Sequence, residues 1–410
     1  LWTARQMGIR VEELLVVGDF VFDIESGKRA GAPTVWLTNG CPIHPGKFSL
    51  PPDQVVASLS EVEALIEALL PLPLGKLPNR DLASILALLP SEDPSLLLPA
   101  GVGEDVCAVE LEETSEVLVL KSDPITFATD RLAYYSVVVN ANDIATVGAS
   151  PRWFLSTLLF PEGTTRNDVE KLMSELHETC GKIGLTLAGG HTEITDSVSK
   201  PVVVGHVAGT VSRDRLLRKQ SICEGDSLLL TKAIAIEGTT ILSREFPIQL
   251  QVLGVEELEV AKWQELLVNP GISILEEAAI AAGHPGVRAM HDVTEGGIST
   301  ALLEFSVASK HQLMVDPESI AILPETRRLC NLTHISPLGL IASGSLHIAV
   351  APSDESALVV KLQEAGIEVS RIGQASGIGT GVRSSSQFTP WPEFEADEIV
   401  KASGFLQKLA

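Results

Sequence analysis

Cysteine is scarce in this sequence, and its few copies lie far apart. The 410 residues contain 5 cysteines, and none belongs to a CxxC pair. Disulfide frameworks and zinc sites both need paired or closely spaced thiols, so this pattern indicates neither. The sequence also lacks any apolar run of about 18 residues, the length that spans a bilayer. We therefore expect a soluble protein of a reducing compartment such as the cytoplasm, with no membrane partner.

Positive charge is limited as well. The chain has 30 Lys and Arg against 53 Asp and Glu, which gives a formal net charge of −23. The densest basic run, "RDRLLRK", is a short segment between two apolar stretches. A field of this sign repels phosphates, so we expect no nucleic-acid partner. For the same reason, this protein would need cations to bridge it to any polyphosphate that it binds.

Hydrophobic patterning divides the chain into three units and one linker. Residues 1–70 alternate short apolar strands with helices, as in "EELLVVGD", "FDIESGKRAGA" and "PTVWLTNG". This alternation is typical of a parallel α/β sheet. The proline-rich stretch "PLPLGKLP", residues 71–78, predicts a linker. Residues 79–225 and 226–410 are strand-rich with long helices, and they predict two successive α+β domains.

Acidic residues stand at the ends of several predicted strands. Asp105 precedes a strand in "GVGEDVCAV", Asp123 ends one in "VLVLKSDPITF", and Asp292 ends another in "RAMHDVTEGGIST". Mg²⁺ prefers oxygen ligands and commonly joins protein carboxylates to substrate phosphates. Separated carboxylates that meet around Mg–ATP would let an acidic protein hold a triphosphate. An Asp at a strand end is also a common turn or N-cap residue, and that alternative stays open for each position.

One predicted helix carries polar residues in a mostly apolar sequence, "VVVNANDIATVGASPRW", residues 137–153. Ser136, Asn140 and Asp143 follow the i, i+4, i+7 spacing, so they share one face of the helix. A buried carboxylate costs several kcal/mol unless a metal or a strong donor faces it. We therefore expect this stripe to line a cleft with such a partner at Asp143. The alternative is that the polar stripe faces water.

Taken in order, these motifs together with "LAGGHTEIT" and "CEGDSLLLTK" resemble the aminoimidazole ribonucleotide synthetase (AIR synthase) superfamily. Within it, HypE-like proteins, named for a hydrogenase-maturation factor, give the closest likeness, over residues 75–390. The resemblance implies a two-domain AIR synthase-like fold. A strand-rich N-terminal ATP-binding domain would pair with its copy in a homodimer, and an α/β sandwich would follow it.

The same resemblance implies an enzyme that uses ATP and Mg²⁺. It would transfer the γ-phosphoryl group of ATP to an oxygen of a small-molecule or protein-borne acceptor, for carbonyl or amide activation or for dehydration. Metal binding would fall to Asp105, Asp123 and Asp143. Contacts with ATP would involve a wider set: Asp105, Asn140, Asn142, Gly189, Gly190, Thr192 and Asp292.

Asp123, Asp143 and His191 are the catalytic residues that the resemblance implies. Gly189 to Thr192 resemble a loop that approaches ATP or substrate, although the glycine pair by itself also fits a hairpin connection. His191 would position substrate or transfer a proton, and a histidine in a loop is as often a simple hydrogen-bond donor.

This chain lacks the cysteines on which two groups of relatives carry out their reactions. HypE carries its reacting group on a C-terminal cysteine, whereas this chain ends "GFLQKLA" and its last cysteine is Cys330. Selenophosphate synthetases use a cysteine or selenocysteine near the start of the domain, where this chain reads "LGKLPNRD". We therefore expect neither reaction. An activity like that of thiamine-monophosphate kinase stays open, as does an inactive ATP-binding or scaffold protein.

The first unit resembles the C-terminal half of a haloacid-dehalogenase (HAD) phosphatase, a Rossmann-like fold. In that motif Asp19 and Asp23 would help to hold Mg²⁺. A HAD enzyme also needs a DxD nucleophile strand, and the sequence contains no DxD. We expect the chain to be a fragment of a longer fusion, the alternative being a structural remnant. Phosphatase activity would require the missing half.

Overall fold

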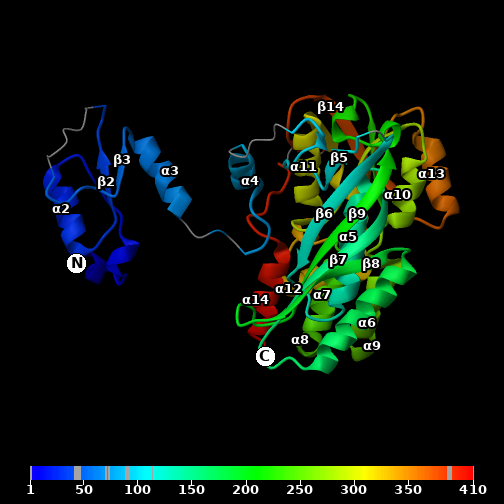
Figure 1. Ribbon diagram of the computed structural model, residues 1–410, viewed down its shortest axis with the longest axis horizontal. Coiled ribbons are helices and arrows are strands. Elements are labelled where there is room, and N and C mark those ends of the chain that lie inside the picture. The colour runs from blue at the N-terminus through cyan, green and yellow to red at the C-terminus, as the bar shows by residue number, and fades with distance from the viewer. Residues whose placement is uncertain are drawn as a thin grey trace. The chain divides into compact units, whose positions relative to one another are not determined.

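The computed structural model of the protein describes residues 2–40, 48–69, 72, 74–87, 93–112, 114–385 and 390–409. The chain forms two compact units, residues 1–72 and 73–410 (Figure 1). The break falls inside the segment predicted as the linker, whereas the boundary at residues 225 and 226 stays a prediction. No described helix is long and apolar enough to cross a membrane. Cys41 lies outside the described residues.

Unit 1 contains a parallel three-stranded sheet. Its strands are β1 (Val16–Gly18), β2 (Thr34–Leu37) and β3 (Gln54–Val56), in the order β1-β2-β3. Its helices are α1 (Trp2–Met7), α2 (Val21–Ala30) and α3 (Leu59–Leu69), with a short turn at Val11–Glu13. Parallel neighbours need a crossover connection, which α2 supplies between β1 and β2. The α/β alternation predicted for this region is confirmed.

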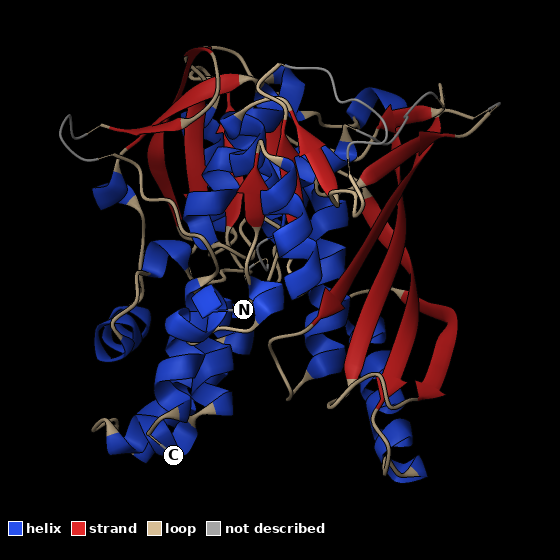
Figure 2. Ribbon diagram, turned by 90° about the vertical axis from the view of Figure 1, so that its left-hand side faces the viewer, coloured by secondary structure: helices blue, strands red, loops and turns tan. Residues whose placement is uncertain are grey.

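The first sheet of unit 2 has six strands in the order β4-β5-β6-β9-β7-β8. Their bounds are Leu96–Leu98, Cys107–Glu110, Glu116–Ile125, Val202–Ser212, Ser150–Phe160 and Thr186–Ile194 in that order. Alternate residues of β9 are buried, as in a sheet with one covered face. Helices α5 (Leu132–Thr146) and α6 (Arg166–Lys182) cover that face, and the other face carries no helix of the described residues (Figures 1 and 2).

The second sheet of unit 2 has the order β11-β13-β10-β14-β12-β15. The bounds are Val287–Asp292, Leu346–Val350, Ser227–Thr231, Val369–Ile378, His311–Val315 and Val382–Ser384 in that order. Every residue of β10 and β13 is buried, because helices cover both faces of this sheet. Leu228 and Leu230 share a core with α11 (Gly297–Ser309), and Leu229 shares another with α10 (Leu275–Ala282) and α13 (Glu355–Glu364). The predicted α+β class is confirmed.

Further helices surround these sheets. They are α4 (Asn79–Leu86), α7 (Ile236–Glu245), α8 (Pro247–Val252), α9 (Glu257–Glu265), α12 (Pro324–Thr333) and α14 (Glu398–Gln407). Short helical turns lie at Arg213–Arg215, Lys219–Ser221, Leu267–Gly271, Pro317–Ser319 and Pro337–Gly339.

Helix α5 joins the two sheets of unit 2. It packs on β6 and β9 of the first sheet and against β11 and α10 beside the second. All of its residues except Tyr134 are buried. Its close approach to β9 depends on glycine, since an added Cβ at Gly205 would lie 2.4 Å from Asn140 Nδ2. Small residues on β9 therefore set where the polar residues of α5 lie.

We expect Gly205→Ala to lower the free energy of unfolding by about 1–3 kcal/mol, because the added methyl group overpacks the contact between β9 and α5. The matched control is Gly181→Ala in α6, where nothing lies within 4 Å of the added Cβ. Alanine is the better helix former, so the control should be slightly stabilised. Urea unfolding measures both effects. A Gly205→Ala protein as stable as the parent would contradict the close packing.

Candidate functional site

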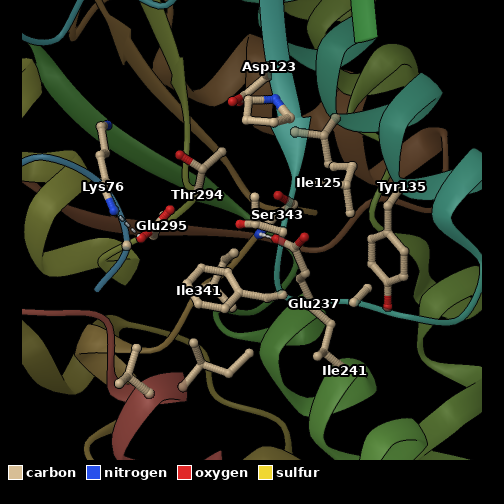
Figure 3. A pocket seen from close by; sticks show the side chains of 18 of the residues that line it. Lys76, Asp123, Ile125, Tyr135, Glu237, Ile241, Thr294, Glu295, Ile341 and Ser343 are labelled. Atoms are coloured by element: carbon tan, nitrogen blue, oxygen red, sulfur yellow. Dashed lines mark hydrogen bonds between the residues drawn. The ribbon is translucent and has the colours of Figure 1, made fainter. Parts of the chain in front are cut away.

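A cavity of about 1080 Å³ opens in unit 2. Residues of β6, α5, α7 and α14 line it, together with the segments that precede β5, α4 and α11, and Figure 3 shows part of this lining. Asp105, Asp123 and Asp143 all belong to the lining. The fold thus brings these three carboxylates to one cavity from three separate elements. Their roles as metal ligands stay predictions.

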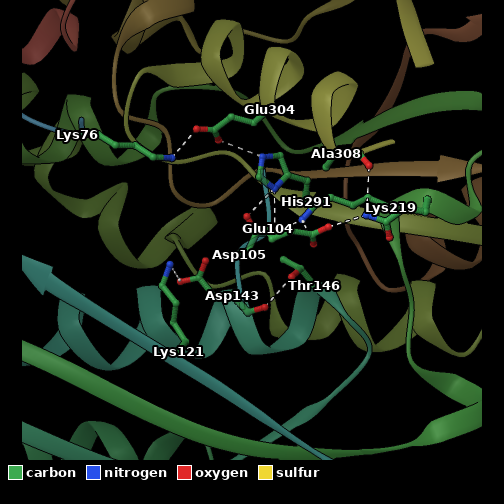
Figure 4. Close-up of polar contacts among 11 residues, drawn as sticks. Lys76, Glu104, Asp105, Lys121, Asp143, Thr146, Lys219, His291, Glu304 and Ala308 are labelled. Atoms are coloured by element: carbon green, nitrogen blue, oxygen red, sulfur yellow. Dashed lines mark hydrogen bonds and ion pairs between the residues drawn. The ribbon is translucent and has the colours of Figure 1, made fainter. Parts of the chain in front are cut away.

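Lys121 contacts two of these carboxylates. Its Nζ lies 3.2 Å from Asp143 Oδ2 (Figure 4) and 3.6 Å from Asp123 Oδ2. Lys121 and Asp123 are two positions apart on β6, so both side chains leave the same face of the strand. Burial disfavours the charged ammonium, but Asp143 and Asp123 outweigh this effect and raise the pKa of Lys121 above its usual range. A permanent positive charge therefore stands at the cavity wall.

Two buried carboxylate oxygens, Asp143 Oδ2 and Asp292 Oδ2, accept no hydrogen bond from the described residues. The Lys121 ammonium is near Asp143 Oδ2, but their contact is an ion pair without hydrogen-bond geometry. An unsatisfied buried polar atom costs about 1–3 kcal/mol. Burial, followed by the charge of Asp292, raises the pKa of Asp143. A cation at these two oxygens would satisfy the unpaired atoms and would also stabilise the ionised form of Asp143.

Charged side chains of alternating sign form a row that includes Asp105, Glu304 and Lys76 of the cavity lining (Figure 4). Lys219 Nζ lies 2.7 Å from Asp105 Oδ2, and His291 Nδ1 lies 2.8 Å from Asp105 Oδ1. On its other side His291 Nε2 is 3.4 Å from Glu304 Oε2, and Lys76 Nζ is 2.6 Å from Glu304 Oε1. Each charge thus has a neighbour of opposite sign.

Burial and ion pairing oppose each other along this row. Burial disfavours the imidazolium form of His291, but Asp105 outweighs it and raises the pKa of His291 to about 9. Burial likewise disfavours ionised Glu304, but Lys76 and His291 lower the pKa of Glu304 to about 2. Lys219 and His291 keep the pKa of Asp105 well below its usual range despite burial. Asp105, His291 and Glu304 therefore favour their charged forms at neutral pH.

Asp292 lies next to this row. Asp105, His291 and Asp292 each offer a ligand atom within 4.8 Å of the others, and this is the group with metal-ligand spacing among the described residues. Burial, with Asp105 nearby, raises the pKa of Asp292 to about 6. Both ring nitrogens of His291 already face carboxylates. Carboxylate oxygens are the donors that remain, and these are the ligands that Mg²⁺ prefers.

The two amides of α5, both predicted to contact ATP, lie on different sides of the helix, and neither belongs to the cavity lining. Asn140 Nδ2 donates to the carbonyl oxygens of Asp123 and Ser136, at 3.2 and 2.8 Å. Asn142 Nδ2 donates to the carbonyl of Ile272, and its Oδ1 accepts from the N–H of Ile274. Residues i and i+2 do not share a helix face. Asn142 therefore anchors α5 to a neighbouring segment.

Gly189 to Thr192 form part of the edge strand β8, and not the predicted loop. None of them lines the cavity of this chain. His191 is exposed, with Nε2 3.5 Å from Glu193 Oε2. Gly190 has φ 151°, and an added Cβ would lie 2.0 Å from Ser156 O. The glycine therefore allows β8 to pair closely with β7, a role that requires no ligand.

Asp19 and Asp23 lie in unit 1, and both are exposed. Asn39 Nδ2 donates to Asp19 Oδ2 at 3.4 Å. No cluster of three metal-ligating side chains includes either residue in the part of unit 1 that the structure describes. Their role as a HAD-type metal site stays a prediction.

The cations that accompany the carboxylates are not predicted by the sequence motifs. Lys76, Lys121, Lys219 and His291 all reach the charged groups around the cavity. Two of them had a local signal, since Lys121 shares a strand face with Asp123 and His291 directly precedes Asp292. Lys76 and Lys219 have no such local signal, because their carboxylate partners are far away in the sequence.

The comparisons with known proteins agree with this architecture. The "AIR synthase related protein, N-terminal domain" family matches residues 103–211, and its C-terminal domain family matches residues 224–382. Residues 1–62 match the HAD-hydrolase-like family. A putative hydrogenase expression/formation protein of Methanocaldococcus jannaschii is 27% identical over 278 residues, which are 67% of this chain and 76% of the relative.

The names of two other relatives describe two different enzyme activities. The carbamoyl dehydratase HypE of Rhizobium leguminosarum is 24% identical over 61% of this chain and 69% of its own length. A selenide, water dikinase of Carboxydothermus hydrogenoformans is 26% identical over 74% of this chain and 93% of its own length.

Among solved structures, the hydrogenase maturation protein HypE in complex with ATP shares the fold. Its TM-score is 0.59 at 18% identity, covering 75% of this chain and 92% of that one. The two matched domains, the two sheets and the cavity between their elements lead to one assignment: this chain belongs to the AIR synthase-related family of ATP-dependent enzymes.

Proposed function

We propose that this chain binds ATP with Mg²⁺ and transfers the γ-phosphoryl group to an oxygen of its acceptor. The observation that carries the proposal is the pair of buried oxygens without hydrogen bonds, Asp143 Oδ2 and Asp292 Oδ2, beside a cavity that Asp105 and Asp123 also line. These oxygens need positive charge. A cavity of about 1080 Å³ has room for a nucleotide and a second ligand.

The donor set fits magnesium. Asp105, Asp123 and Asp143 would hold the ion, with Asp292 beside Asp105. Bound there, Mg²⁺ would supply the charge that offsets a triphosphate in an acidic protein. Asp123 and Asp143 would be catalytic in the sense of fixing this charge next to the reacting phosphoryl group.

The chain's own cations would complete the phosphate site. Lys121 presents its ammonium between Asp123 and Asp143, and Lys76, which also lines the cavity, presents another that Glu304 holds. Phosphoryl transfer depends mostly on positioning and charge neutralisation. These fixed lysines would orient the phosphates toward the acceptor oxygen, while apolar residues of the cavity wall would limit the access of water.

The relatives support ATP use and leave the acceptor specific to each protein. A HypE structure holds ATP, while the names of two relatives describe carbamoyl dehydration and selenide phosphorylation. We therefore carry ATP over to this chain and neither of those acceptors.

We also propose a homodimer that forms through the uncovered face of the first sheet. Leu120 and Leu155 on this face are 38% and 41% exposed. Leu120 lies opposite Ala208 of β9, so apolar side chains adjoin one another across the strands. An exposed apolar sheet face commonly marks an interaction surface. In such a dimer β8 would approach the partner, and Gly189, Gly190, His191 and Thr192 would serve the partner's ATP site.

Asp123→Asn and Asp143→Asn should each lower the kcat of ATP turnover about 100-fold or more, since each removes negative charge that would hold the metal. Asp196→Asn changes an exposed carboxylate and should leave kcat unchanged. Melting temperatures check that the variants fold. Normal turnover in both site variants would falsify the metal assignment.

Calorimetry with ATP should show binding in Mg²⁺ and little or none in EDTA, because the carboxylates of the cavity repel a free triphosphate. Binding without turnover would favour an inactive ATP-binding protein. No binding in either condition would favour a scaffold and contradict the proposed enzyme.

Leu155→Arg should shift the chain from dimer to monomer in sedimentation analysis, because it buries a charge in the proposed interface. The control is Ile248→Arg, on a residue of α8 that is 70% exposed. A parent protein that is monomeric at micromolar concentration would exclude the dimer, as would a Leu155→Arg protein that stays dimeric.

A further inference from the structure

One part of the cavity lies away from the proposed phosphate site and is mostly apolar. Figure 3 shows Glu237 and Ser343 next to each other there, near Tyr135, Ile241 and Ile341. We propose that this recess binds a protonated amine or amidine group of the acceptor, held by Glu237 and Ser343. The inference rests on the proposed function only in calling the ligand the acceptor, since the recess itself is defined by these side chains.

Glu237 and Ser343 present unused hydrogen-bonding atoms. Glu237 Oε2 accepts from the N–H of Ser343 at 3.1 Å, and Glu237 Oε1 has no hydrogen bond within the described residues. Ser343 is 1% exposed, and its Oγ has no partner in the described residues. Glu237 is also buried, at 4% exposure. A cavity-lining carboxylate and a buried hydroxyl without a partner suit a ligand rich in N–H groups.

The charge around Glu237 favours a cation. Burial raises the pKa of Glu237 to about 7, the neighbouring Ser343 opposes this shift, and the charges of Asp397 and Glu295 add to it. Asp397 accepts hydrogen bonds from the N–H groups of Gly296, Ile341 and Ile399. The backbone N–H of Lys76 donates to Glu295. Glu237 differs from these two carboxyl groups in lying next to a buried hydroxyl without a partner, that of Ser343.

The nearby cations are already engaged elsewhere. Arg244 Nη1 donates to Asp130 Oδ2 at 2.6 Å, and Lys200 Nζ donates to Thr126 O at 2.7 Å. Lys76 Nζ is held by Glu304. No basic side chain of the described residues makes a hydrogen bond or ion pair with Glu237. A cationic ligand would therefore be the counterion of Glu237, whereas an anionic group would be repelled.

Aromatic and aliphatic side chains complete the recess. Phe127, Tyr135, Ile241 and Ile341 all line the cavity. The Tyr135 hydroxyl already pairs with Thr240 Oγ1 at 3.1 Å, so Tyr135 offers its ring to the ligand. Aromatic rings attract cations, and an apolar surrounding strengthens an ion pair. The recess thus suits a small apolar body that ends in a charged nitrogen group.

The test compares benzamidine with its neutral isostere benzamide, by calorimetry on the full chain. Benzamidine should bind the parent protein about 10-fold or more tightly than benzamide, because hydrogen bonds to charged groups contribute the extra affinity. Glu237→Gln keeps the shape of the side chain and should abolish this preference. Ser343→Ala should weaken benzamidine binding by roughly three- to tenfold.

The matched control is Glu245→Gln. Glu245 lines the same cavity, but Thr129 already donates to it, so this variant should keep the preference for benzamidine. Melting temperatures of all variants establish that they fold. The proposal is overturned if benzamide binds as tightly as benzamidine, if neither binds at millimolar concentration, or if Glu245→Gln loses the preference as Glu237→Gln does.

Binding of Mg–ATP, measured on the same samples, separates this inference from the proposed function. ATP binding without a preference for benzamidine would overturn the proposal that the recess binds a cationic group, and would leave the proposed function standing. A preference for benzamidine without ATP binding would support the recess and contradict the proposed function. Weaker ATP binding in Glu237→Gln would assign the recess to the nucleotide and overturn the inference.

Discussion

Carboxylates buried between two sheets impose the main constraint on this structure. Asp143 and Asp292 are each no more than 3% exposed, and the side chain of Asp105, within the charged row, is 9% exposed. A buried charge is costly unless a partner of opposite sign faces it. Lys121, Lys219 and His291 supply those partners from within the chain. The oxygens that remain without hydrogen bonds are the ones that point to an external cation.

Helix α5 positions this arrangement because its neighbouring residues face different surroundings. Asn142 is fixed to the backbone of Ile272 and Ile274, Asp143 faces the cavity, and Ile144 packs next to Gly209 of β9. Interactions on several sides leave the helix little freedom to rotate. The proposed metal ligand is therefore held rigidly, as electrostatic catalysis requires.

The cavity combines two kinds of electrostatic environment. Around Lys121 and Lys76, positive side chains balance the carboxylates. Around Glu237, burial and neighbouring carboxylates leave a group without a counterion in the described chain. This contrast supports a division of the cavity into a site for phosphates and a site for a cationic part of the acceptor. One acidic protein would then use added positive charge for both ligands, from a metal in one place and from the acceptor in the other.

The sequence by itself determined the α/β alternation of unit 1 and the α+β class of unit 2, since strand and helix periodicity are local properties. Of the polar stripe predicted to line a cleft, only Asp143 lies in the cavity lining, and Ser136 and Asn140 do not. The sequence also identified Asp105, Asp123 and Asp143, because carboxylates at strand ends and within an apolar helix stand out along the chain. Only the tertiary structure decided that Asn142 anchors a helix, that Gly190 lies within an edge strand, that Glu304 and Glu237 line the cavity, and that Lys219 pairs with Asp105. Those residues acquire their surroundings from segments up to 228 positions away, and no local pattern records which charges will be buried together.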